Sequence, residues 1–276
     1  MYQYSLGMYE KAMPDDMPLQ EKLQMAKECG FDHVEFCVDL KEERANRLNW
    51  TKEERAYWRN LSSGMGVPFT TFSLSLLRKN PLGVLDERRN QESFRVLEEG
   101  CRLAFDLGSR VLLINGYDVY DEPSTDETVA RFYENLTKAV DLCARYGIVV
   151  GIENAEKPFC RTIADAVSIC KRVPSPFLRV YGDIGNETNS WDGDGKKTVA
   201  GLLEGEGYIT SLHLKDSLPG EYRLKDYGSG HVDFAACIEA AKKMHIHLFT
   251  AEIFCDSSRD YIAYAKYVSE FLRSFF

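Results

Sequence analysis

Eight short apolar runs, rich in β-branched and aromatic residues, alternate with longer amphipathic segments along the 276-residue chain. The short runs predict strands, which we place at residues 4–9, 33–38, 68–74, 111–115, 148–153, 178–183, 208–214 and 247–253. The segments that follow them predict helices at 19–29, 52–65, 87–107, 126–146, 163–171, 196–204, 234–244 and 258–276. Parallel strands need a long crossover between them, so this alternation indicates βαβ units and a parallel sheet.

The number of these units indicates whether the sheet closes into a barrel or stays open. Eight units without a linker, a low-complexity tract or a shift of composition favour one closed (β/α)₈ barrel, and hence one domain, over residues 1–276. Such barrels commonly contain about 250 residues. The alternative is a doubly wound sheet, which would be expected to carry a phosphate-binding Gly-x-Gly-x-x-Gly sequence after its first strand. Leu-Gly-Met-Tyr-Glu-Lys, at residues 6–11, stands there instead.

Composition and charge limit the partners that we expect. The chain is 44% hydrophobic and 28% charged, as in an ordinary soluble globular protein. Its net charge of -9 argues against a nucleic-acid partner, because such binding depends on clustered Lys and Arg. No run approaches the roughly 18 apolar residues that span a membrane, and residues 1–5 do not resemble a signal peptide. We therefore expect a cytoplasmic protein with a small-molecule partner, either as a single chain or as a homo-oligomer.

Cysteine usage agrees with a cytoplasmic location. None of the eight cysteines forms a Cys-x-x-Cys pair, and most fall inside apolar helix or strand patterns. A disulfide framework is typical of shorter, secreted chains. We therefore predict buried, reduced thiols.

Four polar side chains end consecutive strand patterns in the second half of the chain. Three are acids, Glu153, Asp183 and Glu252, and the fourth is a histidine, His213. They are spaced by 30, 30 and 39 residues, each about one βα unit. Side chains at the C-terminal ends of barrel strands face the reaction centre, so we expect these four to converge there.

Three carboxylates and one imidazole suit one divalent ion with mixed oxygen and nitrogen preference, such as Mn²⁺, Zn²⁺, Co²⁺ or Mg²⁺. Three carboxylates gathered without a cation would repel one another. Any one of these residues alone would more often be a helix cap, an ion-pair partner or a structural histidine. Their occurrence at four successive strand ends favours a metal site. Of the other histidines, His33, His245 and His247 fall away from the catalytic face, whereas His231 lies in a loop that could approach a substrate.

Further segments give the sequence a resemblance to a known family. They include Leu-Gly-Met-Tyr-Glu-Lys-Ala-Met-Pro at 6–14, Gly-Tyr-Asp-Val-Tyr at 116–120, Asp-Ile-Gly-Asn at 183–186 and His-Leu-Lys-Asp at 213–216. The chain resembles, over nearly its whole length, the xylose-isomerase-like barrels that epimerise or isomerise sugars. It resembles most closely the L-ribulose-5-phosphate 3-epimerases, also called L-xylulose-5-phosphate 3-epimerases or hexulose-6-phosphate isomerases. His-Leu-Lys-Asp marks only the superfamily, and the other three segments are specific to the phosphopentulose branch.

This resemblance implies a metal-dependent C3 epimerase of L-ribulose 5-phosphate or L-xylulose 5-phosphate. One metal would be held by Glu153, Asp183, His213 and Glu252, and the two glutamates would also form the acid/base pair. A metal that polarises the carbonyl and the adjacent hydroxyl makes the C3 proton more acidic. One glutamate would remove that proton, giving a cis-enediolate, and the other would return a proton to the opposite face.

The resemblance also provides candidate substrate contacts. The expected phosphate donors are basic residues in the loops, namely Lys11, Arg78, Lys215 and Arg223. We favour Lys215 and Arg223 because barrel phosphate sites often lie near the last strands. Asn186 is expected to hydrogen-bond a sugar hydroxyl. Two loops that should border the substrate, at 77–83 and 154–158, depart from the family pattern, so the exact sugar stays open.

Other functions fit parts of the pattern. A 3-epimerase of free ketoses or an aldose–ketose isomerase would use the same four ligands, but without a cationic pocket one sugar length from the metal. An endonuclease-like barrel acting on abasic DNA would need more histidines around several metals, whereas one of the five histidines here ends a strand pattern. A sugar-phosphate sensor would not need the pair of glutamates, Glu153 and Glu252.

Overall fold

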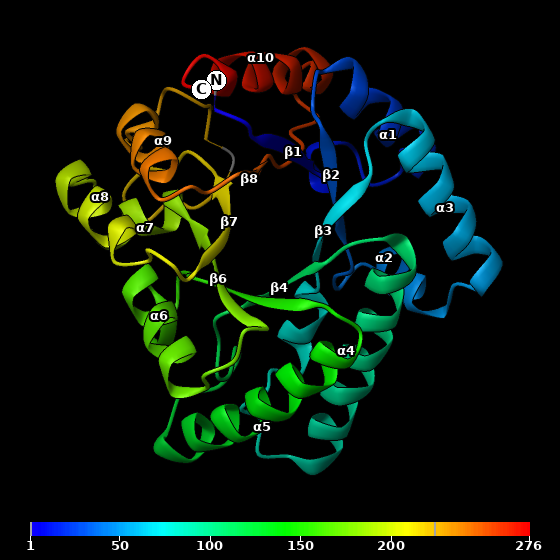
Figure 1. Cartoon of the computed structure of the whole chain (residues 1–276), viewed down its shortest axis with the longest axis vertical. Coiled ribbons are helices and arrows are strands. Elements are labelled where there is room, and N and C mark those ends of the chain that lie inside the picture. Colours follow the sequence, from blue (N-terminus) through cyan, green and yellow to red (C-terminus); the bar gives the residue numbers. More distant parts are fainter. Residues whose placement is uncertain (1, 224) are drawn as a thin grey trace.

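The computed structural model describes residues 2–223 and 225–276, and its centre is a closed barrel of eight parallel strands (Figure 1). The strands are β1 Ser5–Tyr9, β2 His33–Cys37, β3 Phe69–Ser73, β4 Val111–Asn115, β5 Val149–Glu153, β6 Leu178–Asp183, β7 Ile209–Leu214 and β8 Leu248–Ala251. The ring closes where β1 pairs with β8, with Ser5 opposite Leu248. The predicted (β/α)₈ barrel is confirmed, and the alternative of a doubly wound sheet is excluded.

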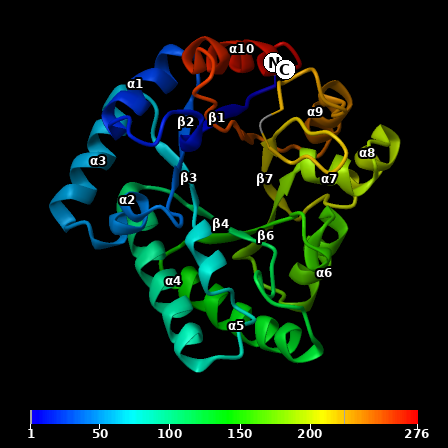
Figure 2. The ribbon, with the colours of Figure 1, turned by 180° about the vertical axis from the view of Figure 1, so that it is seen from behind.

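The helices form an outer ring around the barrel, which the views from both sides show (Figure 1, Figure 2). They are α1 Leu19–Glu28, α2 Glu42–Ala45, α3 Lys52–Met65, α4 Glu87–Leu107, α5 Asp126–Arg145, α6 Ile163–Arg172, α7 Ile184–Ser190, α8 Gly195–Leu203, α9 Phe234–Lys243 and α10 Tyr261–Arg273. Short 3₁₀ turns follow several strands: η1 Glu10–Ala12, η2 Asn46–Asn49, η3 Ser75–Lys79 and η4 Pro158–Cys160. Among the described residues, no helix has the length and apolar character needed to cross a membrane.

The helices cover the strands through apolar faces that the sequence encodes. In α4, for example, every third or fourth residue is buried, including Val96, Leu97, Cys101 and Ala104. Because both faces of each strand are covered, the strands themselves are almost wholly buried. All eight cysteines are free, and all except Cys255 are buried.

The interior of the barrel is polar towards its C-terminal end. The side chains that meet there come from five strands and are at most 1% exposed: Glu35, Thr71, Tyr181, His213 and Thr250. Successive residues of a strand point to opposite faces, so these positions are the inward-facing ones. These side chains thus form a hydrogen-bonded polar layer inside the barrel, beneath the strand ends.

Two elements near the site differ from the predictions. Helix α7 was not predicted, because it begins directly where β6 ends; the side chain of Asp183 accepts a hydrogen bond from the Asn186 backbone N–H and so starts the helix. The last strand was predicted to run to residue 253, but it ends at Ala251, so Glu252 follows the strand.

Candidate metal centre and active site

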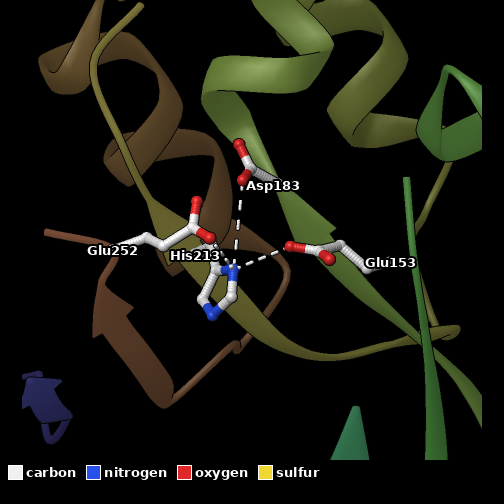
Figure 3. A group of neighbouring side chains, drawn as sticks. All are labelled: Glu153, Asp183, His213 and Glu252. Carbon is white, nitrogen blue, oxygen red and sulfur yellow. Dashed lines mark hydrogen bonds and ion pairs between the residues drawn. The ribbon is translucent and has the colours of Figure 1, made fainter. Parts of the chain in front are cut away.

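The structure brings together the four residues predicted to bind a metal. One ligand atom from each of Glu153, Asp183, His213 and Glu252 lies within 4.8 Å of the others (Figure 3). Nδ1 of His213 is 2.9 Å from Glu153 Oε1, 3.9 Å from Asp183 Oδ2 and 4.0 Å from Glu252 Oε1. We call these four residues the strand-end cluster. Its role in binding a metal stays a prediction.

The pairing of the strands explains why these side chains converge. Asp183 lies opposite His213 between β6 and β7, and Glu153 lies opposite Tyr181, two residues before Asp183. Residues two apart on a strand share a face. Glu252 likewise comes two residues after the partner of His213 in β8. Strands β5, β6, β7 and β8 therefore each place one inward-facing side chain at the C-terminal end of the barrel.

Amide side chains hold the acids in place. Asn115 donates a hydrogen bond to Glu153 Oε2 at 2.5 Å. Asn154 accepts from the backbone N–H of Asp183 at 2.7 Å. The side chain of Asn186, predicted to contact a sugar hydroxyl, donates to the Asn154 carbonyl at 2.8 Å and also borders the cavity above the cluster.

Lys215 is part of this network. Its ammonium nitrogen lies 2.7 Å from Asp183 Oδ2 and 2.7 Å from Glu252 Oε2, and the residue is 6% exposed. We predicted Lys215 as a phosphate donor. The structure places it instead directly beside the two carboxylates, at the end of the cavity where the metal is expected.

Burial and neighbouring charges shift the pKa values of the cluster residues in opposite directions. Burial raises the pKa of Asp183 to about 7, although the Lys215 ammonium works against that increase. Burial would also raise the pKa of Glu252, but Lys215 and His213 outweigh it and lower that pKa to about 2. Burial lowers the pKa of His213, but Glu35 and Glu252 outweigh burial and raise it well above its usual range.

The donor set fits a divalent cation. Asp183 Oδ2 and Glu252 Oε2 are buried, and within the described residues neither accepts a hydrogen bond of good geometry. Each lies 2.7 Å from the Lys215 ammonium, and Asp183 Oδ2 also lies 3.9 Å from Nδ1 of His213, so three carboxylates face one lysine and one imidazole. Oxygen and imidazole ligands at such an open strand end are typical of Mn²⁺, Zn²⁺, Co²⁺ and Mg²⁺ sites.

Two adjoining cavities open at this end of the barrel, and the first of them lies over the cluster. The first, of about 470 Å³, is bordered by Glu153, Asn186, Lys215 and Glu252 below and by aromatic and basic side chains around its wall: Arg78, Tyr117, Tyr120, Tyr222 and Arg223. The second, of about 580 Å³, shares Arg78 and Arg223 with the first and also contains Lys11. Arg78 and Arg223 therefore form a cationic wall beside the cluster, in a cavity that Glu156 and Glu221 also border.

The remaining phosphate candidates differ in how far they are already paired. Lys11 forms an ion pair of 2.7 Å with Asp39. Arg223 lies over the ring of Phe254, 5.1 Å from its centroid. Arg78 has no carboxylate within 4.0 Å among residues 2–223 and 225–276, and its buried Nε has no hydrogen-bond partner there. Arg223 has no carboxylate within this distance among the described residues either, and Arg78, like Arg223, lies over an aromatic ring, that of Tyr120. Arg78 and Arg223 are thus both open to an anionic ligand.

Comparison with known proteins identifies the family. A sequence model described as the xylose isomerase-like TIM barrel matches residues 23–275. The chain belongs to this family. L-ribulose-5-phosphate 3-epimerase UlaE of Salmonella heidelberg (strain SL476) and that of Escherichia coli (strain K12) are each 35% identical to it over 241 residues, which cover 87% of this chain and 84% of theirs. The predicted resemblance to the L-ribulose-5-phosphate 3-epimerase branch is confirmed, and the protein is an enzyme of the isomerase class.

Solved structures show the same fold as this xylose isomerase-like barrel. An L-ribulose 3-epimerase superimposes with a TM-score of 0.80 and 16% identity, covering 99% of this chain and 96% of that one. D-psicose 3-epimerase from Clostridium cellulolyticum H10, solved with D-tagatose, gives a TM-score of 0.82 at 13% identity, covering 98% and 99%. At these identities the similarity establishes the fold alone.

One residue in this family member was missed by the sequence analysis. Glu35, in the middle of β2, is fully buried, and its Oε1 lies 2.7 Å from Nε2 of His213. A charged residue inside an apolar strand pattern was the available signal. His231, the other loop histidine considered, instead contacts Ser217 through Nε2 at 3.0 Å and borders neither cavity.

Proposed function

We propose that the protein is a divalent-metal-dependent epimerase that inverts C3 of L-ribulose 5-phosphate or L-xylulose 5-phosphate. The observation that carries the proposal is the strand-end cluster, in which Glu153 and Glu252 lie on opposite sides of the line joining Asp183 and His213 (Figure 3). Inversion needs an acid and a base on opposite faces of a planar intermediate, and this arrangement supports such a pair. The substrate class rests on the names of the 35% identical relatives.

Glu153, Asp183, His213 and Glu252 would hold the metal. When bound, it supplies positive charge that polarises the ketone and the adjacent hydroxyl of the sugar. Lys215, 2.7 Å from Asp183 and Glu252, adds a second positive charge at the same place. Negative charge that develops on the two sugar oxygens is thereby stabilised.

The two glutamates would exchange protons with C3. One carboxylate removes the C3 proton and leaves a cis-enediolate, and the other returns a proton to the opposite face. Glu252 is ionised at neutral pH because Lys215 and His213 outweigh burial and lower its pKa to about 2, as a base requires. Which glutamate acts as the base depends on which epimer is bound.

The phosphate would lie against the cationic wall of the cavity. Arg78 lacks a carboxylate partner among the described residues and borders both cavities, and Arg223 stands beside it. Lys11 would contribute positive charge from the second cavity. Lys215 and Asn186, next to the cluster, would contact sugar oxygens near C3 rather than the phosphate. This arrangement favours a phosphorylated sugar over a free ketose.

A substrate panel tests the proposal. Wild-type enzyme should epimerise L-ribulose 5-phosphate far faster than free L-ribulose, incorporate deuterium at C3 in D₂O, and lose activity in EDTA until Mn²⁺ is restored. Arg78→Met should lower kcat/KM for the phosphorylated sugar by roughly 10- to 150-fold, which is the loss of a charge-assisted contact of about 1.5–3 kcal/mol. Its control, Lys79→Met, changes an exposed neighbour.

Two results would contradict the proposal in different ways. Full activity after chelation would exclude metal dependence. A preference for free L-ribulose that Arg78→Met leaves unchanged would assign the protein to the free-ketose 3-epimerases.

A further inference from the structure

We propose that Glu35 is a positioning residue of the metal centre, which fixes the orientation and the tautomer of His213. This inference rests on the metal-dependent function proposed above and extends the site into the barrel interior. Glu35 lies on β2 and His213 on β7, two strands that are not neighbours in the barrel. Their contact therefore spans the barrel rather than following the sheet.

The surroundings of Glu35 do not resemble those of a structural ion pair. The residue is fully buried, and no Lys or Arg nitrogen of the described residues lies within 4.0 Å of it. Its partners are the hydroxyls of Thr71, at 2.7 Å, and Tyr181, at 2.5 Å, and the imidazole of His213. Burying a carboxylate without a strong cation is costly. Its contact with His213 gives this carboxylate a role that a structural ion pair would not have.

The two nitrogens of His213 face different groups. Nε2 lies 2.7 Å from Glu35 Oε1, and a carboxylate accepts but does not donate, so Nε2 carries the hydrogen of this contact. Nδ1 lies on the other side, within 4.0 Å of an oxygen of each of the three cluster carboxylates. Nδ1 is 2.9 Å from Glu153 Oε1 and by the same rule carries a hydrogen of its own; because Glu35 keeps the other hydrogen on Nε2, Nδ1 is the nitrogen that would exchange its hydrogen for a cation. A carboxylate behind a ligating histidine commonly does this.

Glu35 is itself held from several directions. Its Oε2 accepts hydrogen bonds from Thr71 on β3 and Tyr181 on β6. The Tyr181 hydroxyl also lies 3.1 Å from the hydroxyl of Thr250 on β8. The Tyr181 ring packs edge-on against the His213 imidazole, with 4.8 Å between the ring centroids. The imidazole therefore has little freedom to rotate.

Metal binding measured without turnover tests this role. Mn²⁺ is titrated into metal-free wild type, Glu35→Gln and Ser109→Ala, and the affinities are compared by calorimetry. Glu35→Gln keeps the volume of the side chain but places an amide beside Nε2, and it should weaken Mn²⁺ binding by about 10- to 100-fold. Ser109→Ala removes a buried hydrogen bond, from the Ser109 hydroxyl to the Phe69 carbonyl, without touching Glu35 or His213, and should stay within about threefold of wild type.

The outcomes separate this inference from the proposed function. If wild type binds no Mn²⁺, the metal site fails and the inference fails with it. If wild type and folded Glu35→Gln bind Mn²⁺ equally well, the metal site stands and the role of Glu35 is overturned. Equal weakening in Glu35→Gln and Ser109→Ala would indicate general loosening of the core, and would also overturn the role.

A measurement on wild type covers the case in which Glu35→Gln does not fold. In the Zn²⁺-loaded enzyme, ¹⁵N chemical shifts of the histidine rings report which nitrogen carries the proton, and the His213 signals are assigned from their loss in His213→Asn. We expect the proton on Nε2 and the metal on Nδ1. A proton on Nδ1 with the metal on Nε2 would overturn the proposal.

Discussion

Glu10 and Glu252 both lie just past the ends of neighbouring strands, but the charges around them are balanced differently. Glu10 directly follows β1, Glu252 directly follows β8, and the two strands pair in the barrel. Arg47 donates to both Glu10 oxygens at 2.6 Å, and Lys22 lies 3.6 Å away. In this group, which we call the Glu10 cluster, two cations face one carboxylate. In the strand-end cluster, three carboxylates face one lysine and one imidazole.

This difference separates a structural ion pair from a binding site. Burial would raise the pKa of Glu10, but Arg47 and Lys22 outweigh it and lower that pKa. Around Asp183, burial exceeds the effect of Lys215 and raises the pKa to about 7. Both groups are buried and both lie at strand ends. The excess of negative charge, rather than burial, therefore marks the group that is ready for a cation.

The largest expected effect concerns the two glutamates of the strand-end cluster. Glu153→Gln and Glu252→Gln should each reduce kcat by about 10²- to 10⁴-fold, because general acid–base groups usually contribute that much. In D₂O, the variant without the reprotonating glutamate should still exchange the C3 hydrogen without forming the epimer. The variant without the abstracting glutamate should do neither, and the two should exchange roles when the other epimer is the substrate.

Glu156→Gln provides a matched control, since Glu156 borders the same cavity but hydrogen-bonds Tyr117 outside the cluster. It should retain activity within a few-fold of wild type. Near-normal epimerisation by Glu153→Gln or Glu252→Gln with metal bound would contradict a mechanism in which both glutamates transfer protons.

The second effect should appear in stability alone. Arg47→Met removes the main partner of Glu10 and leaves a buried carboxylate poorly paired. It should lower the free energy of unfolding by about 3–5 kcal/mol, as measured by urea unfolding of the metal-free protein. Mn²⁺ affinity should not change.

The matched control is Arg95→Met, which breaks an exposed ion pair with Glu92 and should cost no more than about 1 kcal/mol. If Arg47→Met lost Mn²⁺ affinity without losing stability, the Glu10 cluster would not be a purely structural ion pair, and the distinction between the two clusters would be wrong.

The third and smallest effect concerns a buried carboxylate with neutral partners. Glu187 accepts hydrogen bonds from Trp191 Nε1 at 2.8 Å and from the Ile163 N–H at 2.7 Å. Burial raises its pKa from 4.5 to about 7, so between these pH values the folded protein binds more protons than the unfolded chain. The free energy of unfolding should therefore fall as the pH rises through this window, by on the order of 3 kcal/mol.

Glu187→Gln cannot ionise and should remove that fall. Unfolding in urea at pH 4.5, 6 and 7.5 checks this. Parallel pH profiles of wild type and variant would show that Glu187 has the same pKa in the folded and unfolded protein, and so that burial does not raise it.

Sequence patterns predict this fold well because strand and helix periodicities are local. The eight strands lie within a few residues of their predicted places. Helix α7 escapes prediction because its Gly, Asn and Ser residues are poor helix formers; the Asp183 cap helps to start it. The strand-end cluster was predictable because an acid that ends an apolar strand is conspicuous.

Pairing across the barrel was not predictable from the sequence. Glu10 directly follows a predicted strand, and only Arg47 and Lys22, which come from other elements of the fold, show that it is neutralised. The role proposed for Glu35 likewise depends on its contact with His213, which lies 178 residues further along the chain. Such partners are set by closure of the barrel, and no periodicity in the sequence encodes them.

The contact between Glu35 and His213 has a consequence for the order of folding. It joins residues 178 apart, and the barrel closes only when β1 meets β8 at the far end of the chain. Contacts between such distant residues form late and slowly, whereas helices form early. During refolding, a tight Mn²⁺ site should therefore appear only after the ring has closed, and its time course would measure the rate of that last step.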